Sequence, residues 1–266
     1  MENYTFFLAP VATSFLLAVM MACLGIFILW RRMIFVGIAL SQSAGLGTVI
    51  GYICGINPFF SGLSATLLAV GLINVSFSEK VLHKDNINAF VYVFCSALTI
   101  LLLVLFPTLE WGENEIFGGN LLYTSFDDLM VIIPFFILFL GLFVKMKRQW
   151  VILAIHDQEN NPIKKRGQDR LFFILLAMVI ALTSRWAGLL FTFGTLLFPA
   201  LFVHLIAFSL KNIFYALVLF TLVITAIGVG IGFLFNLPLG IAVVICMGAT
   251  VVITKLIKIC FVRKPK

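Results

Sequence analysis

Charged residues are scarce in this sequence. Only 11% of its 266 residues are Asp, Glu, Lys or Arg, while 62% are hydrophobic and the mean hydropathy is +1.17. Soluble domains contain about 25% charged and about 45–50% apolar residues, so a soluble fold of this length has too small an interior for so much apolar surface. The scarcity of charge therefore excludes an ordinary soluble protein and indicates a chain embedded in lipid.

Groups that perform chemistry are also few. The apolar stretches hold no Asp, Glu or Lys away from their ends, the three histidines stand far apart, and the five cysteines include no CxxC pair. The sequence contains no nucleophile–base pair, no GxxxxGK[ST] phosphate loop and no cluster of metal ligands. It therefore predicts no intrinsic ATPase, no proton relay, no enzymatic activity and no bound cofactor.

The basic residues are distributed as in a membrane protein. The net charge of +7 would suit nucleic acid only if these residues shared an exposed face, but they form short clusters between the apolar runs, so no nucleic-acid partner is expected. Cytoplasmic loops carry an excess of Lys and Arg. Placing Arg31-Arg32, Lys80 to Lys84, Lys145 to Arg170, Lys211 and Lys255 to Lys266 in the cytoplasm puts 17 of the 18 basic residues there, Arg185 being the exception.

Long apolar runs follow one another along the whole chain. A spanning helix needs about 20 mostly apolar residues. The candidate spans are 6–30, 33–54, 58–78, 87–107, 129–144, 171–184, 186–208, 212–235 and 238–259. Two of them, 129–144 and 171–184, are short. The sequence therefore predicts an all-α transmembrane bundle of eight or nine helices, forming a single transmembrane domain over residues 1–266. With nine spans the N-terminus lies outside and the C-terminus inside.

The second span combines glycines with polar side chains. Gly47, Gly51 and Gly55 recur every four residues and so lie on one helical face, a spacing that lets helix backbones approach closely. Two interpretations are open: close packing within one bundle, or a subunit interface or translocation seam. The same helix is the best candidate to line a path, through its polar residues Ser41, Gln42, Ser43 and Thr48.

Several motifs, in order and at the expected spacing, resemble the permease subunits of bacterial ABC importers for zinc, manganese and iron. The motifs are Trp30-Arg31-Arg32-Met33, Gly37, Leu40, Leu46-Gly47, Asn57-Pro58-Phe59, Ala187-Gly188-Leu189-Leu190 and Leu196-Leu197-Phe198-Pro199-Ala200, with a weaker match over Phe117 to Leu122, Thr124 and Asp127-Asp128. The resemblance implies a multi-pass protein of the bacterial inner membrane, in which Gly188 is another packing position.

The resemblance also implies partners. Two permease copies, or two related permeases, would form the path in the lipid membrane. Separate ATP-binding subunits would act from the cytoplasm, and an extracytoplasmic binding protein would deliver the substrate. Segment 151–167 corresponds to the family's coupling segment, and its Asp157, Glu159 and Gly167 are similar to a D-x-E…G pattern, with a spacing to the glycine about two residues longer. A solvated charged loop is the alternative interpretation of this segment.

The sequence departs from the family at the metal ligands. The second helix of such permeases typically reads G-D-x-L-x-H, and the i, i+4 spacing places Asp and His on one face, where they suit Zn²⁺ or Mn²⁺. Here Ile38 and Gln42 stand at those positions, and the metal ligands are unknown, with Cys54 or Met20-Met21 as the softer candidates. Three alternatives remain: metal passes without being held there, the substrate is different, or a second permease supplies the ligands.

The expected function is therefore that of the permease subunit of an ABC importer for Zn, Mn or Fe. A related ABC permease for a non-metal or chelated substrate is the first alternative. A membrane carrier that works without a motor is the second.

Overall fold

The described part of the chain is helical. The computed structural model describes residues 2–76, 84–106, 119, 121–155, 162–206 and 212–262, and no strand occurs among them. The elements are α1 (Glu2–Trp30), α2 (Ile34–Cys54), α3 (Pro58–Ser76), α4 (Lys84–Leu105), the short 3₁₀ helix η1 (Leu121–Tyr123), α6 (Phe126–Ile155), α7 (Pro162–Ile206), α8 (Ile213–Phe235) and α9 (Leu239–Val262). The predicted all-α bundle is confirmed.

These segments are helices because lipid offers backbone groups no hydrogen-bond partner, so a spanning segment must satisfy its own. Seven helices in the described residues are long and apolar enough to cross a membrane, and the apolar part of α3, Pro58–Ile73, is shorter. The predicted span 129–144 is shorter than the helix that contains it. α6 is 30 residues long, because its exposed Lys145, Lys147 and Arg148 continue the helix beyond the apolar stretch.

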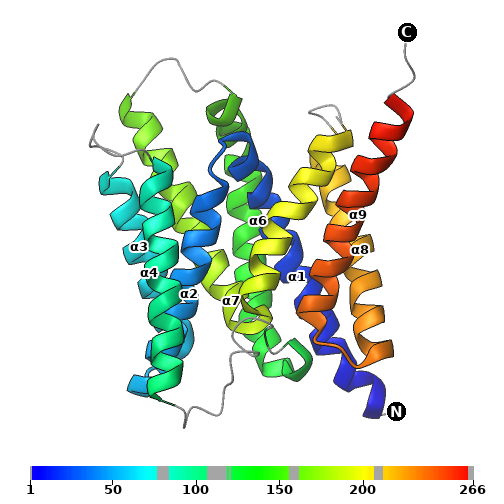
Figure 1. Ribbon diagram of the computed structural model, residues 1–266, viewed down its shortest axis with the longest axis horizontal. Coiled ribbons are helices and arrows are strands. Elements are labelled where there is room, and N and C mark those ends of the chain that lie inside the picture. Colours follow the sequence, from blue (N-terminus) through cyan, green and yellow to red (C-terminus); the bar gives the residue numbers. More distant parts are fainter. Residues whose placement is uncertain are drawn as a thin grey trace.

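Helix α7 reverses direction within its length. Its 45 residues are helical except at Gly188, where φ is 80° and ψ is 170°. Figure 1 shows one arm running down to this point and the other running back up. The two arms are the predicted spans 171–184 and 186–208. Counted with both arms of α7, the described helices make nine crossings, within the predicted eight or nine.

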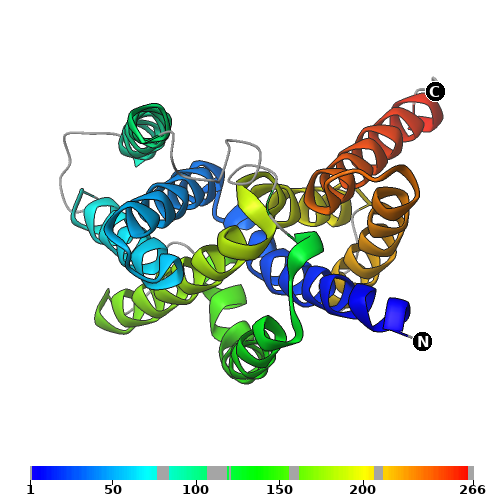
Figure 2. The ribbon, with the colours of Figure 1, turned by 90° about the horizontal axis from the view of Figure 1, so that it is seen from below.

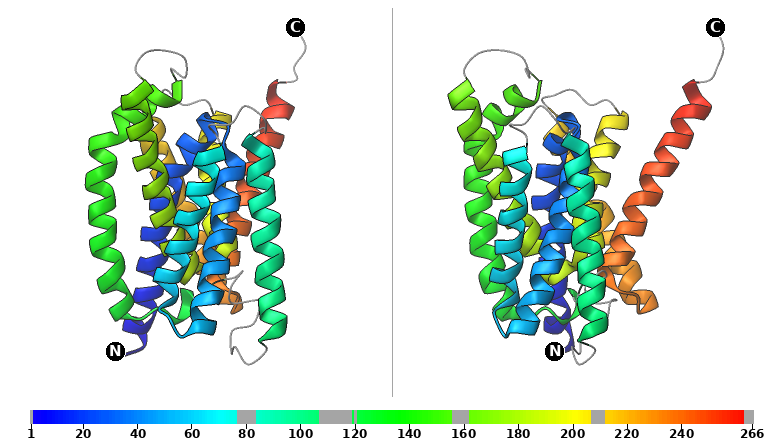
Figure 3. Two further views of the ribbon diagram at one scale, coloured as in Figure 1. Left: turned by 90° about the vertical axis from the view of Figure 1, so that its left-hand side faces the viewer. Right: turned by 60° about the vertical axis from the view of Figure 1, so that its left-hand side comes forward.

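The crossings alternate in direction, so the two ends of the bundle differ. The C-terminal ends of α1, α3, α6, α7 and α9 lie at one end of the bundle together with the N-terminal ends of α2, α4, α7 and α8, and the N-terminal end of α1 lies at the other (Figures 1 and 3). The first end carries the basic clusters, and is called the cytoplasmic end below, because basic residues remain inside. The opposite end is called the outer end. The first residues of α1 and the last residues of α9 lie at opposite ends of the bundle, as nine crossings require.

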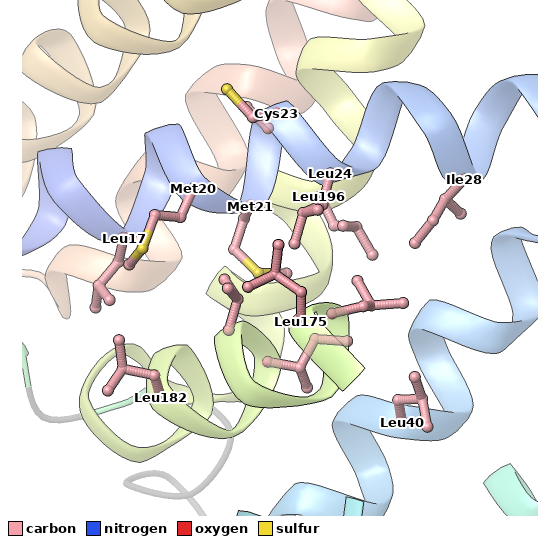
Figure 4. Close-up of a cluster of buried hydrophobic side chains, with 14 of the residues drawn as sticks. Leu17, Met20, Met21, Cys23, Leu24, Ile28, Leu40, Leu175, Leu182 and Leu196 are labelled. Atoms are coloured by element: carbon pink, nitrogen blue, oxygen red, sulfur yellow. The ribbon is translucent and has the colours of Figure 1, made fainter. Parts of the chain in front are cut away.

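The centre of the bundle is formed by α1 and α7. Seen along the helices, α2, α3 and α4 lie to one side of this pair, α8 and α9 to the other, and α6 covers a third side (Figure 2). Figure 4 shows Met21 and Leu24 of α1 packed with Leu175 and Leu196 from the two arms of α7. At Gly25 the backbones of α1 and α7 are so close that a Cβ atom would overlap the carbonyl oxygen of Leu196.

Candidate translocation path

Helix α2 is packed on several sides but not on all. It contacts α3, α4 and α7, and most of its residues are buried. Three residues one turn apart, Phe35, Ile38 and Gln42, remain accessible: Phe35 is 55% exposed, and Ile38 and Gln42 are half-buried. Their i, i+3, i+7 spacing places them on one face of the helix. We call these three residues the open stripe.

Gln42 carries an unusual polar atom. Its Oε1 is buried and has no hydrogen-bond partner among the described residues. A buried acceptor without a donor costs about 1–3 kcal/mol, and such an atom in a native protein requires an explanation. The amide is neutral, so the position offers a substrate hydrogen bonds or a single neutral oxygen ligand, in place of a charged one.

The other polar residues of α2 are satisfied within the helix itself. Ser41 Oγ donates to Ile38 O at 2.9 Å, Ser43 Oγ to Ala39 O at 2.7 Å, and Thr48 Oγ1 to Ala44 O at 2.9 Å. Such back-bonding hides a hydroxyl in an apolar setting. The four predicted path residues do not share a face, and among them only Gln42 lies on the open stripe.

Ser43 and Thr48 instead point to neighbouring helices. Ser43 Oγ lies 3.9 Å from the sulfur of Cys95 on α4. Thr48 Oγ1 would be 3.0 Å from a Cβ atom added at Gly62 of α3. Both hydroxyls therefore lie at contacts between helices of this chain.

The glycines of α2 also have different surroundings. A Cβ atom at Gly47 would lie 2.6 Å from Ser61 O, and one at Gly51 would lie 2.9 Å from Ser61 Cβ, so both positions face α3. Ser61 Oγ also donates a hydrogen bond to Gly47 O, at 2.5 Å. Gly55 meets nothing within 4 Å. It ends α2 with φ 68°, where its N–H bonds to carbonyls of the last turn, as left-handed C-terminal glycines do.

Gly188 forms the reversal of α7 rather than a contact between straight helices. The combination φ 80°, ψ 170° lies in a region open essentially to glycine alone. Gly119 rests on this turn, because a Cβ atom there would overlap the backbone of Ala187 and Gly188. Thr192 Oγ1 donates to Gly188 O at 2.7 Å, which satisfies a carbonyl at the start of the second arm.

A group of polar and aromatic residues that the sequence did not reveal lies at the outer end. Asp128 Oδ2 accepts hydrogen bonds from Ser125 N at 2.8 Å and Ser125 Oγ at 3.0 Å, and the side chain of Trp186 also bonds to Asp128. The Cζ of Arg185 lies 5.7 Å from the ring centroid of Tyr52 and 5.9 Å from that of Trp186. These contacts join α2, α6 and α7. The one feature of the sequence that pointed to this group was Arg185, the single basic residue that the predicted topology places outside.

Part of the predicted coupling pattern lies outside the described residues. Asp157 and Glu159 lie outside the described residues, and so do His83 and His156. Gly167 lies in the first arm of α7, which begins at Pro162. His204 is exposed. Among the described residues there is no group of three or more His, Cys, Asp and Glu that could hold a metal ion.

The chain matches the ABC 3 transport family over residues 3–258. It belongs to that family. This member is 26% identical to the high-affinity zinc uptake system membrane protein ZnuB of Haemophilus influenzae over 193 residues, which cover 71% of this chain and 73% of ZnuB. It is 24% identical over 246 residues to the manganese transport system membrane protein MntC of Listeria innocua, with 91% of this chain and 87% of MntC covered.

Solved structures show the same fold for this ABC 3 family member. A chain of PsaBC from Streptococcus pneumoniae, solved in complex with Fab, superposes with a TM-score of 0.81 at 21% identity, and the match covers 95% of this chain and 92% of that one. A putative metal-chelate type ABC transporter in an inward-facing conformation gives a TM-score of 0.69 at 14% identity, covering 94% and 85%. The chain is thus a transport subunit with the fold of an ABC permease.

Proposed function

We propose that this chain is the permease subunit of an ABC importer that carries Zn²⁺, Mn²⁺ or Fe²⁺. The observation that carries the proposal is the near full-length similarity to manganese permeases such as MntC, together with the similarity to the zinc protein ZnuB. Two copies, or this chain and a paralogue, form the path. The sequence has no phosphate-binding loop, so separate ATPase subunits at the cytoplasmic end supply the work, and an extracytoplasmic binding protein delivers the metal.

The proposal is tested by isolating the chain with its partners. A tagged chain purified from its native membrane should bring down an ATP-binding subunit, and deletion of that subunit should abolish accumulation of the metal. A tagged membrane protein of similar size from another family serves as the control for the purification. Metal uptake that continues without any ATPase would disprove the proposal.

In this proposal the open stripe of α2 faces the path. Two features support the assignment: Ile38 and Gln42 remain accessible in the single chain, and Gln42 Oε1 lacks a partner. A second copy placed against this face would bring two amides close to one another. Rotation of the Gln42 side chain would bring the amide oxygen, which is buried in this conformation, to the path, where it would accept from a hydrated ion or serve as a neutral ligand.

Gln42→Leu should lower uptake about tenfold, the effect of losing one hydrogen bond or ligand worth about 1.5 kcal/mol. The same change should leave stability equal or higher, because it removes a buried acceptor that has no donor. Uptake rates in vesicles and the melting temperature of the purified complex measure the two effects. Thr66→Val is the matched control, since Thr66 Oγ1 is buried and bonds only within α3. Wild-type uptake by Gln42→Leu would remove Gln42 from the path.

The second candidate is a related ABC permease for a chelated or non-metal substrate. It is favoured by the chemistry of the open stripe, where Ile38 has no ligand atom and Gln42 has no charge. Charged ligands are what a bare divalent cation would require most. Cellular Zn, Mn and Fe contents separate the candidates, because unchanged contents in a deletion strain would favour the second.

We also propose that segment 151–167 receives the ATPase. Its place at the cytoplasmic end, between α6 and α7, supports this role, as does the similarity of Asp157, Glu159 and Gly167 to the family pattern. A charged segment in this place can form polar contacts with a soluble subunit. Any movement it receives enters the bundle through the first arm of α7.

A further inference from the structure

An ion pair joins the start of α2 to the first arm of α7 at the cytoplasmic end. Arg31 belongs to the short connection between α1 and α2, and its Nη1 lies 2.9 Å from Oδ1 of Asp169, 138 residues further along the chain. The side chain of Arg31 is 10% exposed and that of Asp169 32% exposed. The guanidinium is therefore largely withdrawn from solvent.

The arginine is held on two sides by one face of α7. Its Cζ lies 4.8 Å above the ring of Phe172, and Asp169 and Phe172 are three residues apart, so both point from the same face. Phe172 in turn contacts Trp150 of α6 at 5.4 Å and Phe27 of α1 at 6.1 Å between ring centroids. The ion pair therefore packs against an aromatic cluster that is itself closely packed.

The connection that carries Arg31 is stiff. Its backbone N–H groups bond to the last turn of α1: Arg31 N to Phe27 O at 3.0 Å, Arg32 N to Leu29 O at 3.1 Å and Met33 N to Ile28 O at 3.0 Å. Arg32 adopts a left-handed φ of 56°, which fixes the turn. A displacement of Arg31 would therefore be passed to the first turn of α2, which contains Phe35 of the open stripe, and from there to Ile38 and Gln42.

The pairing is incomplete in this conformation. Nε and Nη2 of Arg31 are buried and have no hydrogen-bond partner among the described residues. An arginine that serves only to hold two helices together is best satisfied as a bidentate fork on its carboxylate, and unpaired buried donors are costly. A small movement of Asp169 along the guanidinium would add a second hydrogen bond, so the pair is suited to alternate between two arrangements.

We propose that Arg31 and Asp169 are positioning residues that convert movement of the cytoplasmic end of α7 into movement of α2. The proposal rests on the proposed function, because it takes the first arm of α7 to be where the ATPases act. It assigns a transport role to the contact between Arg31 and Asp169, neither of which belongs to the predicted coupling pattern of Asp157, Glu159 and Gly167. The pair is the described ion pair between the α1–α2 connection and α7.

A reporter on α2 tests this directly. A spin label at Phe35→Cys, an exposed position in the first turn of α2, is placed in the complete transporter with the exposed Cys54 and Cys260 replaced by serine. Because Phe35 belongs to the open stripe, uptake and hydrolysis are measured separately in chains that keep Phe35. ATP should change the spectrum in the wild-type background. In Asp169→Asn or Arg31→Gln the change should largely disappear, and Zn²⁺ or Mn²⁺ uptake per ATP hydrolysed should fall about tenfold, a common size for coupling between sites.

The controls separate coupling from folding. Arg32→Gln removes a neighbouring, exposed charge of the same connection and should preserve both readouts. The charge-swapped pair Arg31→Asp with Asp169→Arg should recover part of the ATP response, because the guanidinium can again reach a carboxylate. If uptake and hydrolysis fell in equal proportion and the label response were unchanged, the contact would be purely structural and the proposal would be overturned. A label in the wild-type background whose spectrum does not change with ATP would also overturn it. Failure of the proposed function would differ: no ATPase would be isolated with the wild-type chain.

Discussion

Gly25→Val should prevent α1 from packing against the second arm of α7 and should leave little folded protein in the membrane. A side chain at this position would overlap the carbonyl oxygen of Leu196, and a backbone carbonyl in a helix cannot move aside as a side-chain tip can. Overpacking usually costs about 1–3 kcal/mol and sometimes more, and the central place of this contact predicts the upper end or beyond. Small residues at such crossings are what allow membrane helices to associate closely.

Yield of monodisperse protein in detergent and its melting temperature measure the effect of Gly25→Val. Gly230→Ala on α8 is the matched control, because a Cβ atom there meets nothing within 4 Å. Alanine is the better helix former by about 1 kcal/mol, so this variant should be as stable as the wild type or slightly more so. A normal yield and melting temperature for Gly25→Val would contradict the prediction, because they would show that the fold does not require close contact between α1 and α7 at this position.

Gly188→Val should disrupt the reversal of α7. Conformations of this kind cost a non-glycine residue about 1–3 kcal/mol, and a β-branched side chain is worse placed still. Gly119 adds a second cost, since it lies directly against the backbone of Ala187 and Gly188. Both arms would then be misaligned with α1, so the expected result is a strong loss of folded protein, with proteolysis in membranes as the readout.

Gly55→Asn tests whether positive φ alone explains the effect at Gly188. Gly55 also has a positive φ, of 68°, but its ψ is 20° and a Cβ atom added there would meet nothing within 4 Å. Asparagine tolerates that left-handed conformation, so this variant should lose less than about 1 kcal/mol. Equal damage from both substitutions would contradict the special role given to the turn at Gly188.

The spans could be predicted because they depend on local composition. Apolar runs of sufficient length become helices in lipid, and the basic clusters decide which end stays inside. The limits of α6 could not be predicted in this way. Its last turns carry Lys145, Lys147 and Arg148, and composition marks the edge of the apolar region rather than the end of the helix.

The arrangement of the candidate site could be predicted from the sequence only in part. In a soluble helix the polar face indicates the solvent side, but the polar residues of α2 point to different sides of the helix, so the sequence does not tell which side meets a neighbouring helix. Gln42, Ser43 and Thr48 looked equivalent, yet the structure turns them toward an open face, α4 and α3. The partners Arg31 and Asp169 are 138 residues apart, and no periodic pattern relates positions so distant.

The single-residue turn at Gly188 also bears on how the chain enters the membrane. The first arm of α7 starts at the cytoplasmic end, the second arm returns to that end, and the two are joined at Gly188 without a loop. Arg185 must cross to the outer end during this step, which costs a charged residue about 2.5–3.5 kcal/mol at mid-membrane. We therefore expect residues 162–206 to be inserted together as a hairpin, with the apolar second arm compensating for the charge near the tip of the first.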